Sequence, residues 1–194
     1  MFLNGKSLGK KGRFSEPVDI PVGSNVSPDK NFYTKYRLLW QVPYEPGTLK
    51  AIAYSSGKEV AAEEVHTAGA PAKIALAPDR KVIHADGDDL SFVTVRIEDK
   101  DGNLCPSADN LVHFGVTGAG EIQAVDNGNA ATVEPFHADH RTAFSGLALL
   151  IVRSQNRPGK IQVVATSDGL SQGEVEIDTA PIGSQNETEL AHLK

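Results

Sequence analysis

Two runs of alternating residues, joined by a polar connection, most constrain what this chain can fold into. The first, residues 90–98, reads LSFVTVRIE, and the second, residues 111–116, reads LVHFGV. Apolar side chains recur at every second position in both, which predicts two half-buried strands. The connection 99–109 contains an Asp101-Gly102 turn signal but is too long for a tight hairpin. We therefore expect the chain to cross here between two facing sheets, as in a β-sandwich.

Short apolar segments bounded by Asp-Gly, Asn-Gly and Pro-Gly turns fill the rest of the second half. The segment 147–152 is apolar on both faces, which indicates a central strand. Residues 129–144 are predicted to form a loop longer than a turn. About seven strands at this spacing are typical of an immunoglobulin-like sandwich. The remaining strands are predicted at 73–76, 82–83, 121–125, 161–166 and 174–177.

The first half is predicted to hold a smaller β-unit. Residues 1–12 are predicted as a hairpin around an Asn-Gly turn, and residues 13–35 as an irregular stretch with a short edge strand at 18–22. The small, uncharged segment 67–72 is predicted as a linker between domains. Further strands are predicted at 36–42, 49–54 and 59–66. The predicted domains are 1–69, 70–180 and a polar tail, 181–194.

The composition favours an all-β protein with an acidic surface. The 194 residues include 18 Gly and 11 Pro, and no helical period appears, which suits short strands and turns. The net charge of -6 argues against binding of nucleic-acid phosphates, which needs a basic face. No apolar run reaches the roughly 18 residues of a membrane span. The single cysteine, Cys105, excludes an internal disulfide.

Two polar segments contain residue types that bind metals. Asp99, Asp101 and Gly102 resemble the start of a calcium loop, but further oxygen ligands and a late glutamate are missing, so a turn is preferred. The loop at 134–140 gathers zinc-type ligands without two separated ligand pairs, and solvated charges are the alternative. Its candidate ligands are Glu134, His137, Asp139 and His140. We predict no metal and no cofactor.

Aromatic side chains in the first half are candidates for stacking on a sugar ring. Trp40 shares its face with Leu38 and Val42, which indicates a core position. Tyr44 lies in the following Pro-rich turn and is the better candidate for an exposed ring. We therefore predict a carbohydrate contact at Tyr44.

Paired carboxylates are the other feature to test for carbohydrate chemistry. Glycoside cleavage needs two carboxyl groups fixed about 5–10 Å apart across a cleft. Asp88-Asp89 and Glu63-Glu64 are sequence neighbours, whose side chains point to opposite faces of a strand. The sequence contains no Ser/His/Asp arrangement in a nucleophile elbow and no phosphate-cradling glycine loop. We predict no catalytic residue in this chain.

Several longer segments are specific enough to compare with a known family. FLNGKSLGKK, YRLLWQVPYEPGTLKAIAY and GKEVAAEEVHTAGAPAKIAL resemble the region after the catalytic barrel of bacterial family 2 glycoside hydrolases of the β-galactosidase type. ADGDDLSFVTVRIEDKDGN, DNLVHFGVTGAGEIQAVDNGN and EPFHADHRTAFSGLALLIVRS resemble their C-terminal immunoglobulin-like domain. The resemblance covers residues 1–8 and 36–178. It implies two tandem immunoglobulin-like β-sandwich domains, the first incomplete because the family has further strands before FLNGKSLG.

The resemblance implies a non-catalytic fragment of such an enzyme with a structural, accessory role in carbohydrate degradation, since the family's catalytic glutamates lie in the barrel. The implied partner is the barrel of the parent enzyme, with carbohydrate and a second copy, paired through the exposed edge of the first domain, as further partners. No nucleic-acid or membrane partner is expected, and the implied location is periplasmic or extracellular. A carbohydrate-binding module and an adhesin-like module of a surface protein are the alternatives, although the two halves do not repeat each other.

Overall fold

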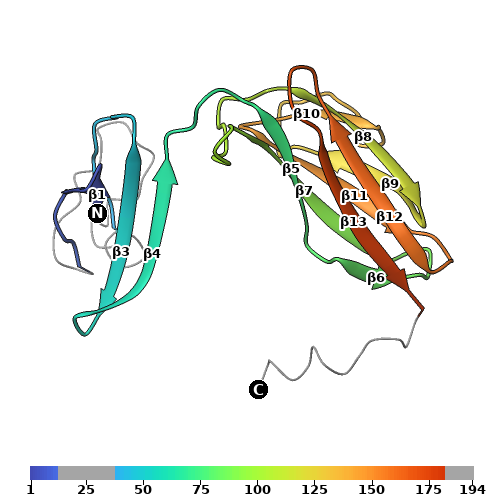
Figure 1. Cartoon of the computed structure of the whole chain (residues 1–194), viewed down its shortest axis with the longest axis horizontal. Coiled ribbons are helices and arrows are strands. Elements are labelled where there is room, and N and C mark those ends of the chain that lie inside the picture. The colour runs from blue at the N-terminus through green and yellow to red at the C-terminus, as the bar shows by residue number, and fades with distance from the viewer. Residues whose placement is uncertain (13–37, 182–194) are drawn as a thin grey trace. The chain divides into compact units, whose positions relative to one another are not determined.

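The computed structural model describes residues 1–12 and 38–181 (Figure 1). The chain divides into two compact units, Met1–Thr67 and Ala68–Lys194, close to the predicted boundary at residue 69. All secondary-structure elements in the described residues are β-strands, which confirms the all-β class. These two ranges contain no helix that is long and apolar enough to cross a membrane.

Unit 1 contains one antiparallel sheet in its described part, with the strand order β2-β1-β3-β4. The predicted hairpin forms around Asn4 and Gly5, which both have positive φ angles, of 49° and 79°. The Asn4 side chain also accepts a 2.8 Å hydrogen bond from the Thr48 backbone, which ties the turn to β3. The strands are β1 (Phe2–Leu3), β2 (Lys6–Ser7), β3 (Thr48–Ser55) and β4 (Lys58–His66).

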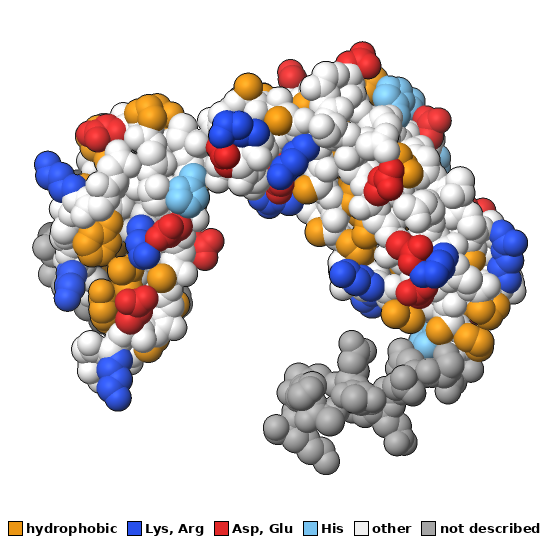
Figure 2. Space-filling model, in the orientation of Figure 1, with side chains coloured by type: hydrophobic (Ala, Val, Ile, Leu, Met, Phe, Trp, Pro, Cys, Tyr) orange, Lys and Arg blue, Asp and Glu red, His pale blue; other side chains and the backbone are white. Residues whose placement is uncertain are grey.

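Strand β4 lies at one edge of the sheet that the described residues form. All nine of its residues are exposed, and only β3 pairs with it among the described residues. Figure 2 shows hydrophobic and charged side chains interspersed over β3 and β4. In the part of unit 1 that the structure describes, one sheet with an exposed edge agrees with the expectation of an incomplete first sandwich.

The prediction of a strand at 36–42 is wrong for residues 38–42, the part that the structure describes. Residues 38–42 belong to no strand, while residues 36 and 37, like the strand predicted at 18–22, lie outside the described residues. The alternation of side chains was correct as a pattern, but a strand also needs a backbone partner. Pro43 follows directly, Pro46 comes three residues later, and neither proline can donate a backbone hydrogen bond to a ladder.

Unit 2 is a two-sheet sandwich (Figure 1). One sheet has the order β5-β7-β11-β9 and the other β10-β8-β12-β13-β6. Strands β7 and β8 therefore lie in different sheets, which confirms the predicted crossing. The bounds are β5 (Lys73–Pro78), β6 (Val82–His84), β7 (Leu90–Glu98), β8 (Leu111–Gly118), β9 (Gly120–Asp126), β10 (His140–Thr142), β11 (Leu147–Ser154), β12 (Gly159–Thr166) and β13 (Gly173–Ala180).

The core of unit 2 lies between the two sheets. Every second residue of β7 points inward, and Val93, Val95 and Ile97 are at most 1% exposed. Leu150 on β11 and Val163 on β12 are fully buried as well. The period of two thus separates the buried side chains from the outward ones in both sheets.

Strand β10 was not predicted, because it lies within the predicted loop 129–144. It pairs with β8 over three residues. Its central residue, Arg141, points inward and is fully buried. A charged side chain at the inward position broke the apolar alternation from which the other strands were predicted.

The segment predicted as the linker is bonded to its neighbours on both sides. The Thr67 backbone N–H donates to the carbonyl oxygen of Gly47 in unit 1, at 2.8 Å. The Gly69 and Ala72 backbone N–H groups donate to Asp99 and Glu98 in unit 2, at 2.7 Å and 2.8 Å. Residues 69–72 are therefore an ordered part of unit 2.

Candidate functional site

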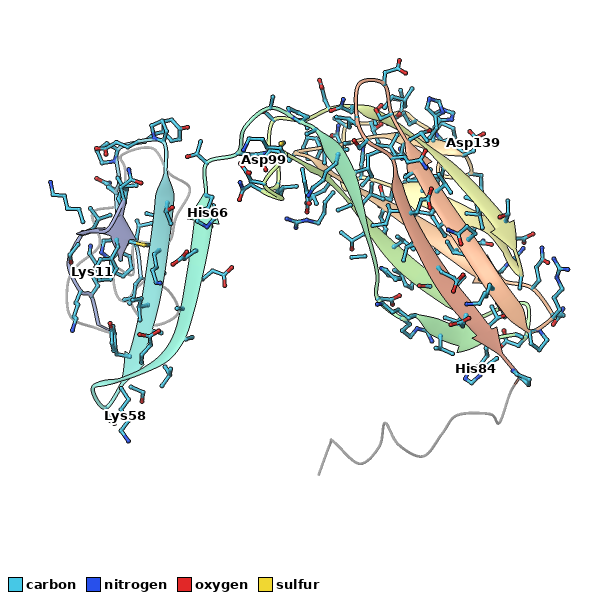
Figure 3. All side chains as sticks on the ribbon, in the orientation of Figure 1. Lys11, Lys58, His66, His84, Asp99 and Asp139 are labelled. Atoms are coloured by element: carbon cyan, nitrogen blue, oxygen red, sulfur yellow. The ribbon has the colours of Figure 1, made fainter. Side chains whose placement is uncertain are left out.

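Asp99, the first residue of the candidate calcium loop, follows directly after β7 (Figure 3). The residue is 2% exposed, and its carboxylate accepts hydrogen bonds from the backbone N–H groups of Gly69, Asp101 and Asn103, at 2.7–2.9 Å. The Asn103 side-chain amide donates to both carboxylate oxygens. The bond from Gly69, with those from Asn103, holds the pKa of Asp99 well below its ordinary value.

These donors occupy the carboxylate oxygens that a calcium ion would need. The structure therefore supports a turn at 99–103, held from within by an aspartate side chain. Cys105 lies beside the same turn, and its thiol is 3.6 Å from the Gly69 carbonyl oxygen. Burial and the nearby negative charges of Asp99 and Glu98 raise the pKa of this thiol, which makes it a poor nucleophile.

The second candidate, the loop before β10, is organised by the buried Arg141. Its guanidinium donates to the backbone carbonyl oxygens of Val125, Glu134 and Pro135, at 2.7, 3.2 and 3.3 Å. It also lies 3.6 Å from the Glu134 carboxylate and 5.3 Å from the ring centre of Phe136. The loop is thus held to β9 and β10 by one side chain.

Glu134 is an acceptor in this arrangement. Its carboxylate accepts hydrogen bonds from the backbone and hydroxyl of Thr142 and from the Thr132 hydroxyl. Burial raises the pKa of Glu134, but these bonds and the positive charge of Arg141 outweigh it, so the net pKa is lowered. The residue is an ionised structural acid.

The other candidate ligands of this loop lie on the outer surface. Asp139 and His140 pair at 2.8 Å with 75% and 40% of their side chains exposed, and the pairing lowers the pKa of Asp139 (Figure 3). The His113 ring lies beside His140, with the ring centres 5.7 Å apart. Across residues 1–12 and 38–181, no three side chains of the types that bind metals converge.

The aromatic candidates of unit 1 differ in exposure. Tyr44 is 79% exposed, as its place in the turn predicted. Trp40 is half-buried rather than a core residue of a strand, and its ring lies beneath the Lys11 ammonium group at 5.7 Å. The buried indole N–H of Trp40 has no hydrogen-bond partner among residues 1–12 and 38–181. Nothing in the described residues shows a sugar site at these rings.

The neighbouring carboxylates are held separately by basic side chains. Asp89 pairs with Arg80 at 2.7 Å on the loop before β7, and Glu64 pairs with Lys50 at 2.6 Å across β3 and β4. Neither pair of acids thus offers two free carboxylates to one substrate.

The sequence analysis missed two important contacts. The bond between Gly69 and Asp99 joins residues 30 positions apart, which no local pattern predicts. The role of Arg141 was also missed, although one signal was available. Arg141 and Ala143 are two positions apart in the sequence and are both buried. The alternation of inward side chains that marks a strand was therefore present, but one of the inward residues is charged.

Family profiles match both units of the chain. A family described as the glycoside hydrolase family 2 C-terminal domain 5 matches residues 74–176, and a domain family of unknown function matches residues 1–61. The first match spans more than half of the chain and nearly all of the sandwich in unit 2.

Similar proteins include family 2 enzymes and a putative β-glucuronidase. The chain is 45% identical to β-galactosidase BoGH2A of Bacteroides ovatus over 91% of the chain and 19% of that protein. It is 28% identical to a putative β-glucuronidase of Formosa agariphila, over 86% and 15%. A solved family 2 glycosyl hydrolase of Bacteroides cellulosilyticus superposes with a TM-score of 0.73 at 37% identity, over 92% of this chain and 21% of that one.

The chain thus spans about one fifth of the length of the relatives that it matches. The match to a C-terminal domain, together with the all-β architecture, corresponds to the non-catalytic end of such proteins and does not favour a free-standing binding module or an adhesin. On these grounds the chain belongs to the C-terminal accessory domains of glycoside hydrolase family 2.

Proposed function

We propose that the protein carrying this chain is a family 2 glycoside hydrolase that acts on β-galactosides, with this chain as its non-catalytic, structural part. The single observation that carries the substrate class is the higher identity to a β-galactosidase than to a putative β-glucuronidase. The acids of the chain support the structural role, because Asp99 and Glu134 hold turns through hydrogen bonds.

The test uses the reading frame upstream of Met1. The longer protein and the 194-residue chain are each incubated with 4-nitrophenyl β-galactoside and β-glucuronide. We expect galactoside turnover by the longer protein and none by the chain alone. Turnover of the glucuronide only would replace the substrate class, and turnover by the purified chain would refute the structural role.

Carbohydrate contact at Tyr44 is a finer proposal, supported by the 79% exposure of its ring. Calorimetric titration of the chain with galacto-oligosaccharides would show binding that is lost in Tyr44→Ala. Tyr54→Ala, which removes another exposed ring of unit 1, is the matched control. Equal binding by the wild-type chain and Tyr44→Ala would contradict the proposal.

Pairing of two chains through β4 is the second finer proposal. The open backbone edge supports it, whereas the charges of Lys58, Glu59, Glu63 and Glu64 on the same strand oppose open-ended pairing. We expect a concentration-dependent dimer in light scattering that Ala62→Pro abolishes. A monomer at all concentrations would contradict it.

We also propose a periplasmic or extracellular location, supported only by the family resemblance. Fractionation of the source cells with an antibody against the chain tests it. Recovery of the protein in the cytoplasmic fraction would refute it.

A further inference from the structure

Two histidines lie opposite each other on β10 and its neighbour β8. His113 on β8 pairs with His140 on β10 in the antiparallel register. The Phe114 backbone N–H donates to the Asp139 carbonyl oxygen at 2.7 Å, which makes the two histidines a non-hydrogen-bonded pair. Side chains approach most closely at such pairs, because their Cα atoms are only about 4.5 Å apart. The backbone thus holds the two imidazoles side by side on one face of the sheet.

The spacing of the two rings fits one shared metal ion. Their centres are 5.7 Å apart, and their planes are tilted by 40°. With a metal–nitrogen bond of about 2.1 Å, each ring centre lies about 3.2 Å from the ion, so two rings on one ion are about 5.2 Å apart at a tetrahedral angle. In a linear arrangement the same bonds place the ring centres about 6.4 Å apart. The observed distance lies between these two values.

Asp139 orients one of the imidazoles in the way that a metal ligand requires. Its carboxylate lies 2.8 Å from Nδ1 of His140. Because an ionised carboxylate can only accept a hydrogen bond, Nδ1 carries the proton, and the lone pair of the neutral ring is left on Nε2. The hydrogen bond from His140 lowers the pKa of Asp139, and the charge of His113 contributes as well, so His113 lies near the same carboxylate. A carboxylate behind a ligating histidine is the usual arrangement at metal sites.

The surroundings of the pair leave room for an ion with its water. The His140 side chain is 40% exposed, and His113 is exposed as well. Gly115 follows on the same face of β8, and a Cβ at this position would meet no described atom within 4 Å. Thr166 on β12, the other cross-strand neighbour of His113, is uncharged. The adjacent cation, Arg141, points inward, so its charge is directed away from the pair.

Two histidines are fewer ligands than a closed structural site contains. Structural zinc sites use four protein ligands, and no third metal-binding side chain converges on the pair within residues 1–12 and 38–181. The remaining coordination positions are therefore open to water. Imidazole suits copper, nickel and zinc, and among these divalent ions copper binds most tightly to a given set of ligands.

We propose that His113 and His140 bind one divalent transition-metal ion, with Cu²⁺ preferred over Ni²⁺ and Zn²⁺, and that water completes its coordination. Asp139 is a positioning residue, which holds the His140 ring without contacting the ion. All three residues belong to unit 2 of this chain, so the inference does not depend on the activity of the longer protein.

Calorimetric titration of the 194-residue chain with CuCl₂, in a weakly coordinating buffer, tests the site. We expect one ion per chain. His113→Gln and His140→Gln should each raise the dissociation constant by more than about tenfold, because loss of even an outer partner of a ligand costs about 10–100-fold. Asp139→Asn should raise it by about tenfold, the lower end of that range, since its side chain is 75% exposed. Cys105 is 1% exposed and does not compete for the ion.

Electron paramagnetic resonance of the Cu²⁺-loaded chain separates the ligands from the positioning residue. The wild-type chain and Asp139→Asn should both show nitrogen hyperfine coupling from two imidazoles, whereas His113→Gln and His140→Gln should show coupling from one. His84→Gln is the matched control, because it removes a histidine from β6, at the opposite edge of the same sheet. We expect this control to change neither the affinity nor the spectrum.

Three results would overturn the proposal. Equal affinity and equal spectra for the wild-type chain, His113→Gln and His140→Gln would show adventitious binding at other groups. Loss of a nitrogen in His137→Gln, in place of His113→Gln, would assign the ion to the loop before β10. A stoichiometry of one ion per two chains, with a dimer in light scattering, would replace the water ligands with a second copy.

Discussion

Replacing Arg141 with methionine is expected to destabilise unit 2 by about 3 kcal/mol, because loss of one partner of a buried ion pair costs about 3–5 kcal/mol. Methionine retains the aliphatic volume but removes donors to three backbone carbonyl oxygens. We expect the lower end of the range, since the Glu134 side chain remains 25% exposed and keeps its bonds from Thr142.

Two residues report on the two units separately in urea. Cys105, the only cysteine, is buried in unit 2, so its labelling by a maleimide follows the unfolding of that unit. Trp40, the only tryptophan, lies in unit 1 and provides its fluorescence signal. With a slope of about 2 kcal/mol per molar urea, the loss corresponds to a fall of about 1.5 M in the midpoint of Cys105 labelling.

The control is Arg153→Met, which removes an arginine of 39% exposure from a surface pair, where such pairs contribute about 0–1 kcal/mol. We expect the Trp40 midpoint to stay constant in both variants. A shift in Arg141→Met no larger than that in Arg153→Met would refute the reasoning. Arg141 would then contribute through its packed stem alone, without its hydrogen bonds.

Two further predictions concern pH and a glycine. The pKa of Asp99 is lowered on folding, so the stabilisation that its carboxylate contributes is complete above about pH 4, the unfolded value, and is lost as pH falls toward the folded one. Asp99→Asn should flatten the decrease in the urea midpoint between pH 5 and 2.5, measured by far-ultraviolet circular dichroism. Gly118→Ala should lower the urea midpoint of Cys105 labelling by more than Gly169→Ala does. At Gly118 φ is 91° and an added Cβ would lie 2.1 Å from the Lys160 carbonyl oxygen, whereas at Gly169 φ is 75° and no described atom lies within 4 Å of an added Cβ.

Most strands of unit 2 could be predicted because a period of two records directly which side chains face the core. The prediction for residues 90–98 coincides with β7, and that for 161–166 lies within β12. The predicted crossing between sheets followed from the length of the connection. These features are local, so the sequence contains them without any knowledge of distant contacts.

The features that were missed depend on contacts between distant residues. Gly69 and Asp99 meet only after the strands have paired, and the role of Arg141 needs carbonyl oxygens from both sides of a loop. The strand predicted at 36–42 failed for the same reason, because alternation cannot show whether a backbone partner is present. Sequence reasoning thus located the candidate acids and preferred a turn at Asp99, but it did not identify the contacts that hold Asp99 and Glu134.

Strand β11 shows that apolar residues on both faces do not require that both faces are covered. The prediction of a central strand was correct, since β11 lies between β7 and β9. Burial within a single domain would explain both faces only if a layer covered each of them. In unit 2 the outward residues of β11 remain half-buried beside the exposed Phe92. The composition of β11 is therefore accounted for by its own sandwich on the inward face alone.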